Sequence, residues 1–134
     1  MTVREKKSAT ILHFGTDRPA LLLRARNLTQ MGYDVLNASN GFEAIELASL
    51  GTVDAVVVDQ NRDSAEVDLI VSEIKRFRPQ LPTILLAEEP GLLRRAQELA
   101  DAWVTRENLK MLAATLEGVL YQQGRAVSGK TISH

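Results

Sequence analysis

The sequence predicts an α/β fold in which a parallel five-stranded sheet carries helices on both faces. Short apolar runs alternate along the chain with longer segments whose apolar residues recur at spacings of three and four. The run 53–59 has an unbroken Val-Val-Val centre, which is typical of a strand covered on both sides. The 134 residues suit one domain, since a chain of this size buries roughly two-thirds of its unfolded surface.

The first strand is expected at 9–14, and a helix follows the break at Gly15. Asp17 can cap that helix, and Pro19 lies in its first turn. Gly32 has the position of a C′ residue that ends it. Its apolar face is expected to consist of Leu21, Leu22, Ala25, Leu28 and Met31.

The next two units repeat this pattern. A second strand is expected at 33–38, and Asn40 with Glu43 resembles a capping box that opens a helix ending near Gly51. The central strand 53–59 precedes a third helix that ends before Pro79. The apolar faces of these two helices are expected to consist of Phe42, Ile45, Leu47 and Ala48, and of Val67, Ile70, Val71, Ile74 and Phe77.

The last two units are shorter. We expect a fourth strand at 82–87, a helix from Leu92 to Leu99, and a fifth strand at 102–105. The most regular amphipathic helix runs from Leu109 to Leu120. The domain organisation predicted is an N-terminal extension at 1–8, one domain at 9–123 and a flexible tail at 124–134.

Composition excludes several kinds of protein. With 16 Lys+Arg and 17 Asp+Glu, the chain has no basic field suited to nucleic acid or a membrane surface. It has no Cys, so disulfides, thiolate catalysis and Cys-type zinc sites are absent. No apolar run reaches the roughly 18 residues of a membrane span. We therefore expect a cytoplasmic protein.

A ligand site is expected where the strands end. In parallel sheets of order 2-1-3-4-5, the flavodoxin-like order, ligands bind at the carboxyl ends of strands one and three. Those ends are residues 15–17 and 59–61. Asp59 is a carboxylate that closes an apolar strand, and its alternative role is to cap a helix or order a loop. His13, within a strand, is expected to be a packing residue that forms no local motif with His134.

These residues bring out a family resemblance over residues 9–122. The segments GYDVLNASNGFEAIELA, VDAVVVD, RPQLPTILLA and ADAWVT follow one another as in response-regulator receiver domains of two-component signalling. The resemblance implies that Asp59 is at the phospho-acceptor position and Trp103 at the switch aromatic. It also implies a flavodoxin-like fold and a bacterial, non-enzymatic signalling role.

The same resemblance exposes substitutions. Receivers hold Mg²⁺ with an acidic pair after strand one and with the acceptor Asp. Here Gly15 and Thr16 occupy the acidic-pair positions, Ala87 that of the switch Thr or Ser, and Arg106 that of the family's Lys. Arg keeps the charge but changes reach and geometry. The expected protein is a degenerate, or pseudo-, receiver with no cofactor.

Three further residues belong to this site. Asn61 matches a common receiver residue whose backbone carbonyl can ligate the metal, although with Asp59 alone the site would be weak. Asp17 and Asp63 are nearby carboxylates, and Asp17 is expected to cap its helix. We further expect Arg106 to pair with Asp59 in place of metal and phosphoryl contacts, the alternative being that Arg106 points to solvent.

Three functions were weighed. The first is an interaction module independent of phosphorylation, with a histidine kinase, adaptor or output protein as partner, or a second copy bound through helix four, strand five and helix five. Leu92, Leu93, Arg94 and Arg95 lie beside Trp103 in that region. The second is a working acceptor that takes phosphate on Asp59 with Mg²⁺, with Asp17 as a substitute ligand. The third, an unrelated flavodoxin-like enzyme or nucleotide binder, lacks a phosphate-binding glycine loop. We expect no DNA-binding domain after residue 122, so the chain is either a stand-alone receiver that acts through a partner or a part of a longer protein.

Overall fold

The computed structural model describes residues 9–59, 64–88 and 95–128. Five strands form one parallel sheet in the order β2-β1-β3-β4-β5, as the sequence predicts. The strands are β1 Thr10–Phe14, β2 Asp34–Ala38, β3 Ala55–Asp59, β4 Thr83–Ala87 and β5 Ala102–Thr105. The helices are α1 Arg18–Gln30, α2 Gly41–Ala48, α3 Ser64–Phe77, α4 Arg95–Leu99 and α5 Leu109–Ser128.

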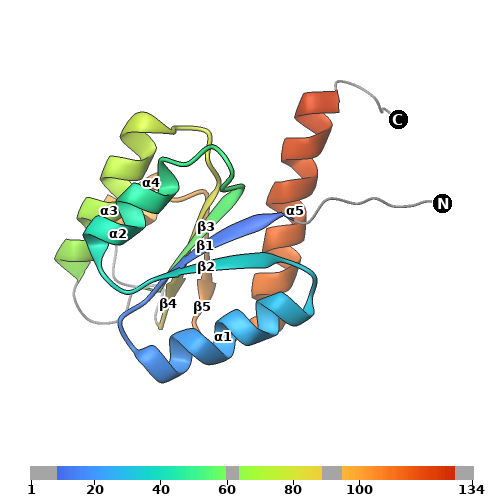
Figure 1. The fold of residues 1–134 in the computed structure, drawn as a ribbon. Coiled ribbons are helices and arrows are strands. Elements are labelled where there is room, and N and C mark those ends of the chain that lie inside the picture. Colours follow the sequence, from blue (N-terminus) through green and yellow to red (C-terminus); the bar gives the residue numbers. More distant parts are fainter. Residues whose placement is uncertain (1–8, 60–63, 89–94, 129–134) are drawn as a thin grey trace.

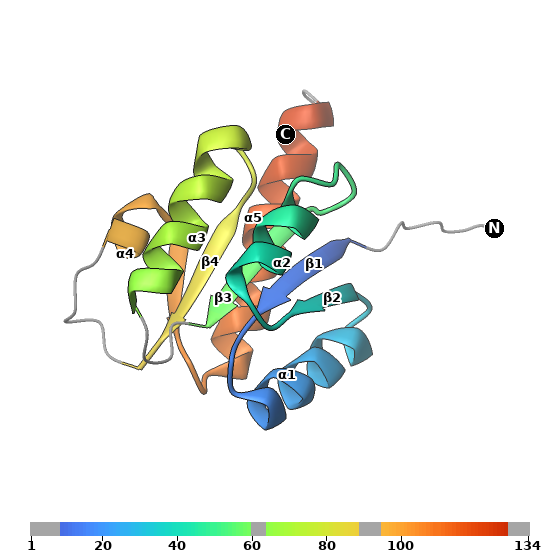
Figure 2. The ribbon, with the colours of Figure 1, turned by 60° about the vertical axis from the view of Figure 1, so that its left-hand side comes forward.

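The helices form two layers around the sheet. Helices α1 and α5 cover one face, while α2, α3 and α4 cover the other (Figure 1). Helices α2 and α3 lie side by side in both views (Figure 2). None of the helices within the described residues is long and apolar enough to cross a bilayer.

Alternating strand residues divide the core between these layers. Ala55, Val57 and Ile84 face the α1/α5 layer, whereas Val56, Val58 and Leu85 face the α2/α3/α4 layer. All six side chains are fully buried. This period of two decides on which face any polar side chain at a strand end will lie.

The predicted helix termini are confirmed where the structure describes them. Asp17 Oδ1 accepts from the amide of Ala20 at 3.3 Å, and Asn40 Oδ1 accepts from the amide of Glu43 at 2.8 Å. Helix α1 ends at a C-cap residue, Met31, and is followed by Gly32 with φ of +103°. These local contacts satisfy backbone groups that a helix end leaves unpaired.

The Gly32 turn gives a direct stability test. Replacing Gly32 with Ala should cost about 1–2 kcal/mol, because L-residues pay this to adopt a positive φ. Gly51→Ala is the matched control: a Cβ meets nothing within 4 Å at either glycine, but only Gly32 has a positive φ. Urea unfolding of both variants measures the difference, and equal midpoints would contradict the role assigned to φ.

The structure corrects several predicted core residues. Leu22, Met31 and Phe42 are 49%, 41% and 76% exposed, although each fits the apolar period of its helix. Leu21, Ala25 and Leu28 fill the α1 interface. A helix presents only a narrow stripe to a sheet, so apolar residues at the margin of the period remain in water.

The C-terminal helix also differs from the expectation. Helix α5 runs through Gly124 and ends at Ser128, within the segment 124–134 that was predicted as a flexible tail. Its last turns contain Gln and Arg, which are good helix formers. Residues 129–134, the extension at 1–8, and Leu92 and Leu93 of the expected fourth helix lie outside the described residues.

Candidate functional site

The candidate site lies at the carboxyl edge of the sheet, around the last residue of β3. Asp59 follows Val57 by two positions, so its side chain is on the α1/α5 face of the sheet. His13 is on the same face, since it follows Ile11 by two positions in the neighbouring strand β1. The period of the strands thus points both polar side chains toward α1 and the start of α5.

Asp59 is a buried carboxylate with a cation on each oxygen. Its side chain is 3% exposed. Oδ1 accepts from Arg106 Nε at 2.8 Å, and Oδ2 accepts from Arg24 Nη1 at 3.2 Å. Charge-assisted bonds of this kind are stronger than neutral ones, especially away from water. The predicted pair between Asp59 and Arg106 is confirmed.

Arg24 is the residue of this site that sequence reasoning missed. It lies on α1 three residues after Leu21 and four before Leu28, and its side chain is only 10% exposed. This spacing places it within the buried stripe of the helix. The position of Arg24 in the helical period therefore indicates that its side chain is buried. The prediction missed this because it assigned only apolar residues to the buried stripe.

Arg24 also contacts His13. The same Nη1 atom lies 3.2 Å from His13 Nε2, and His13 is fully buried. Because guanidinium nitrogens only donate, Nε2 acts as the acceptor, and the neutral ring carries its proton on Nδ1. His13 is therefore a buried packing residue, as expected, and it also accepts a hydrogen bond from Arg24.

The pKa of His13 is lowered to about 4, first by burial and then by the charge of Arg24. Asn37 on the paired strand and the charge of Asp59 oppose this shift but do not cancel it. His13 Nδ1 is buried without a hydrogen bond of good geometry, so the contact with Asn37 is weak. His13 is therefore neutral near pH 7.

Arg106 extends the network toward solvent. Its Nη1 lies 3.2 Å from Glu88 Oε2, just after β4. Glu88 is 76% exposed, so water screens this pair and it contributes little stability. The chain of contacts thus links β1, α1 and β3 with the segments that follow β4 and β5.

The positions of the acidic pair carry no carboxylate toward Asp59. Gly15 is buried, and a Cβ built on it would lie 3.4 Å from Asp59 Cβ and 3.8 Å from Asp59 Oδ2. Thr16 is exposed. The carboxylate of Asp17 caps α1, as predicted. The substitution that matters most is therefore at Gly15, directly beside Asp59.

The remaining predicted residues separate into two groups. Ala87 is buried at the end of β4, where it offers no hydroxyl. Trp103 pairs in register with Leu85 on the edge strand β5 and is 39% exposed. Asn61, Asp63, Arg94 and the side chain of Arg95 lie outside what the structure describes. Among the predicted residues that the structure describes, Asp59 and Arg106 form the centre of the site.

The described residues do not fit a divalent metal. No group of three His, Asp or Glu side chains able to hold an ion occurs within 9–59, 64–88 and 95–128. Mg²⁺ favours carboxylates and other oxygens, whereas the one carboxylate here already binds a guanidinium on each oxygen. Two adjacent cations would repel a third.

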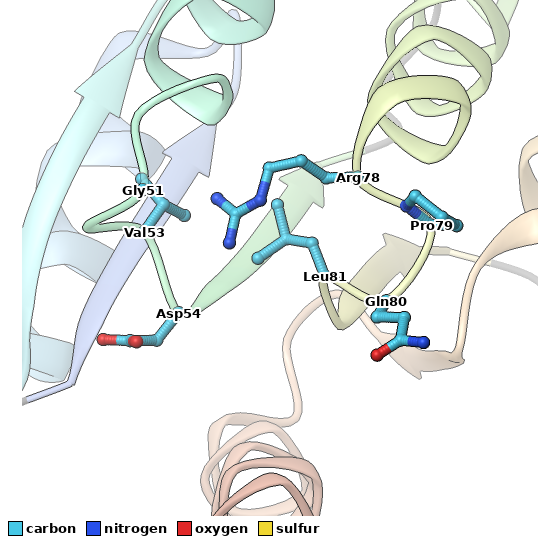
Figure 3. A pocket seen from close by; sticks show the side chains of 7 residues that line it. All are labelled: Gly51, Val53, Asp54, Arg78, Pro79, Gln80 and Leu81. Carbon is cyan, nitrogen blue, oxygen red and sulfur yellow. The ribbon is translucent and has the colours of Figure 1, made fainter. Parts of the chain in front are cut away.

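A hollow at the opposite edge of the sheet has a structural role. It is lined by residues of the segments before β3 and β4, among them Val53, Asp54 and Arg78 (Figure 3). Arg78 Nη1 donates to the carbonyls of Ala48 and Leu50, which closes the end of α2. Because ligands of parallel sheets bind at the carboxyl edge, this hollow is not a candidate.

Comparison with solved structures identifies the fold. A receiver domain from Methanospirillum hungatei aligns with a TM-score of 0.78 and 18% identity, over 90% of this chain and 99% of that one. The signal receiver domain of an HD domain-containing protein from Pseudomonas fluorescens gives 0.78 and 16%, over 96% and 98%. A response regulator from Thermotoga maritima, solved with Mg²⁺-BeF, gives 0.75 and 22%, over 83% and 98%.

No protein-family model matches the chain, and neither does any curated protein. At these identities the likeness shows the fold alone. The molecule has the CheY-like receiver fold of two-component response regulators, with a flavodoxin-like sheet. Within that fold, its carboxylate pocket holds two arginines.

Proposed function

We propose that the chain is a receiver-like signalling module that works by protein–protein contact and not by phosphorylation of Asp59. The observation that carries this proposal is the pairing of both Asp59 oxygens with buried arginines. A phospho-acceptor must present a free carboxylate oxygen to the donor, and a divalent ion must neutralise the charge that develops. Here both oxygens of Asp59 already accept hydrogen bonds from guanidinium groups.

Two further features support the proposal. Ala87 cannot donate a hydroxyl hydrogen bond to a phosphoryl group, so the coupling expected of a switch Thr or Ser is missing. Arg106 is committed to Asp59 and Glu88. Because arginines balance the charge of Asp59, the folded receiver surface can bind a partner without phosphorylation of Asp59.

The partner would be a histidine kinase, an adaptor or an output protein in the cytoplasm, and the chain would have no catalytic activity of its own. Trp103, on the edge strand between α4 and α5, provides an exposed aromatic on this surface. Exposed aromatics are enriched in protein interfaces. A second copy could use the same surface.

The first experiment exposes the protein to acetyl phosphate or beryllofluoride with Mg²⁺. We expect no phosphoryl mass increase and no change in Trp103 fluorescence. The chain has one Trp, so the signal has one source. A receiver that carries the full acidic set, treated in parallel, shows that the reagents are active.

The competing function makes the opposite prediction. If Asp59 accepts phosphate, intact-mass measurement will show one added phosphoryl group, and Asp59→Asn will abolish it. That result would overturn our proposal and establish a working receiver that uses Asp59. A modification that persists in Asp59→Asn would show reaction at another residue and would leave Asp59 unmodified, as we propose.

A further inference from the structure

Arg24 supplies more positive charge to the pocket than Asp59 needs. The buried centre holds two guanidinium groups and one carboxylate, while the second carboxylate on Arg106, Glu88, is mostly in water. A single Arg106–Asp59 pair would already be neutral. The additional cation is therefore a separate feature of this chain that requires its own explanation.

The position of Arg24 is set by packing. Leu21 and Leu28, on either side of it along α1, are 3% and 0% exposed and anchor that stripe of the helix to the sheet. Nη1 then lies between His13 Nε2 and Asp59 Oδ2, at 3.2 Å from each. The neutral imidazole accepts one hydrogen bond and the carboxylate accepts another, so the cation is held on two sides.

Gly15 places no side chain beside the same oxygen, although a Cβ there would press on Leu21. A Cβ at position 15 would lie 3.8 Å from Asp59 Oδ2 and 3.2 Å from Leu21 Cδ1. The φ of Gly15 is not in the left-handed region, so the backbone itself does not require glycine here. A carboxylate at this position would bring a second negative charge next to Asp59.

From these contacts we infer that Arg24 is the resident counter-cation of the pocket, in the place of a divalent ion. The inference rests on the proposed function, since it assumes that Asp59 has no metal-dependent role in the natural chain. It assigns to Arg24 the task of holding a permanent positive charge against Asp59 Oδ2 and so excluding a divalent ion. Losing the acid at position 15 and gaining the cation at position 24 are then two parts of one change.

The test reverses both parts. In Gly15→Asp/Arg24→Ala, two carboxylates face Arg106 alone, and the pocket should bind Mg²⁺. We expect its melting temperature to rise by about 3–6 °C at a Mg²⁺ concentration near ten times Kd. The natural chain and Gly15→Asp alone should show no rise, because Arg24 remains. NaCl at equal ionic strength controls for screening.

The matched control is Gly15→Asp/Arg26→Ala. Arg26 is exposed on the same helix, so this variant has the same composition and net charge as the test variant. It should not respond to Mg²⁺. If Gly15→Asp/Arg24→Ala does not fold, Gly15→Asp/Arg24→Gln removes the charge with less loss of volume, and the same rise is expected.

The outcomes separate the inference from the proposed function. A Mg²⁺ response in the natural chain, or none in either folded Arg24 double variant, overturns the counter-cation role. An equal response in the Arg26 control does the same. By contrast, Asp59-dependent phosphorylation of the natural chain overturns the proposed function, whereas a failed Mg²⁺ gain alone leaves that function standing.

Discussion

Replacing Asp59 with Asn should lower the free energy of unfolding by about 3–5 kcal/mol, because it leaves two arginines without their shared counter-charge in a buried site. Asn has nearly the same shape but no charge. Its amide oxygen can accept from one arginine, but its NH2 group is a donor and would face the other arginine, which also donates. Arg24 and Arg106 are 10% and 14% exposed, so water cannot replace the carboxylate fully.

The sign of this effect distinguishes two kinds of pocket. Where several carboxylates cluster without a metal, removing one relieves repulsion and should stabilise the fold. Here the only close charges to Asp59 among the described residues are cations, together with the neutral His13. Destabilisation by Asp59→Asn therefore indicates internal charge balance.

Urea unfolding near pH 7 measures this effect, and Asp34→Asn is the matched control. Asp34 is exposed on β2, so the same chemical change there should alter stability by no more than about 0.5 kcal/mol. An Asp59→Asn variant as stable as the natural chain, or more stable, would contradict the pairing of Asp59 with both arginines.

Acidification should destabilise the protein through His13. Its pKa is about 4 in the folded chain, against 6.5 when unfolded. Between these values the unfolded chain binds a proton that the folded chain does not, so the free energy of unfolding falls as the pH falls. The contribution of neutral His13 to the free energy of unfolding is fully present above pH 6.5, and roughly 3 kcal/mol of it is lost by pH 4.

Comparison with His13→Gln isolates that contribution. Gln can still accept from Arg24 through its amide oxygen but does not titrate. His134 and all carboxylates are common to both proteins, so their contributions largely cancel in the difference. Urea unfolding from pH 4.5 to 8 should show the natural chain losing stability faster than the variant below pH 6.5. Parallel curves would show that His13 titrates normally and is not held neutral.

Local sequence was sufficient for the architecture. Alternating apolar periods predict each strand and its neighbouring helix, and capping residues such as Asp17 and Asn40 begin their helices where expected. Each of these signals depends on residues within one or two turns of one another. Marginal apolar residues such as Leu22 and Phe42 were misplaced because the period defines a face but not its width.

Part of the candidate site can also be predicted from the sequence. Asp59 is at the end of a central strand, and its pairing with Arg106 follows from two strand ends that the topology brings to one edge. The absence of a carboxylate at Gly15 is also read directly from the sequence. The resemblance to receivers, which places Gly15, Thr16, Asp59 and Arg106 in one pocket, was needed to predict that this pocket balances its own charge.

The tertiary structure alone decided how that neutralisation is achieved. Arg24 and His13 are 35 and 46 residues before Asp59, and although the phase of Arg24 along α1 indicates burial, nothing local identifies its partner. The packing of α1 on β1 and β2 brings the three together and buries them. The sequence by itself therefore determined the fold and the loss of acids beside Asp59. Only the tertiary packing shows that Arg24 is the second cation, because ion pairs can join residues that are far apart in the sequence and become neighbours on folding.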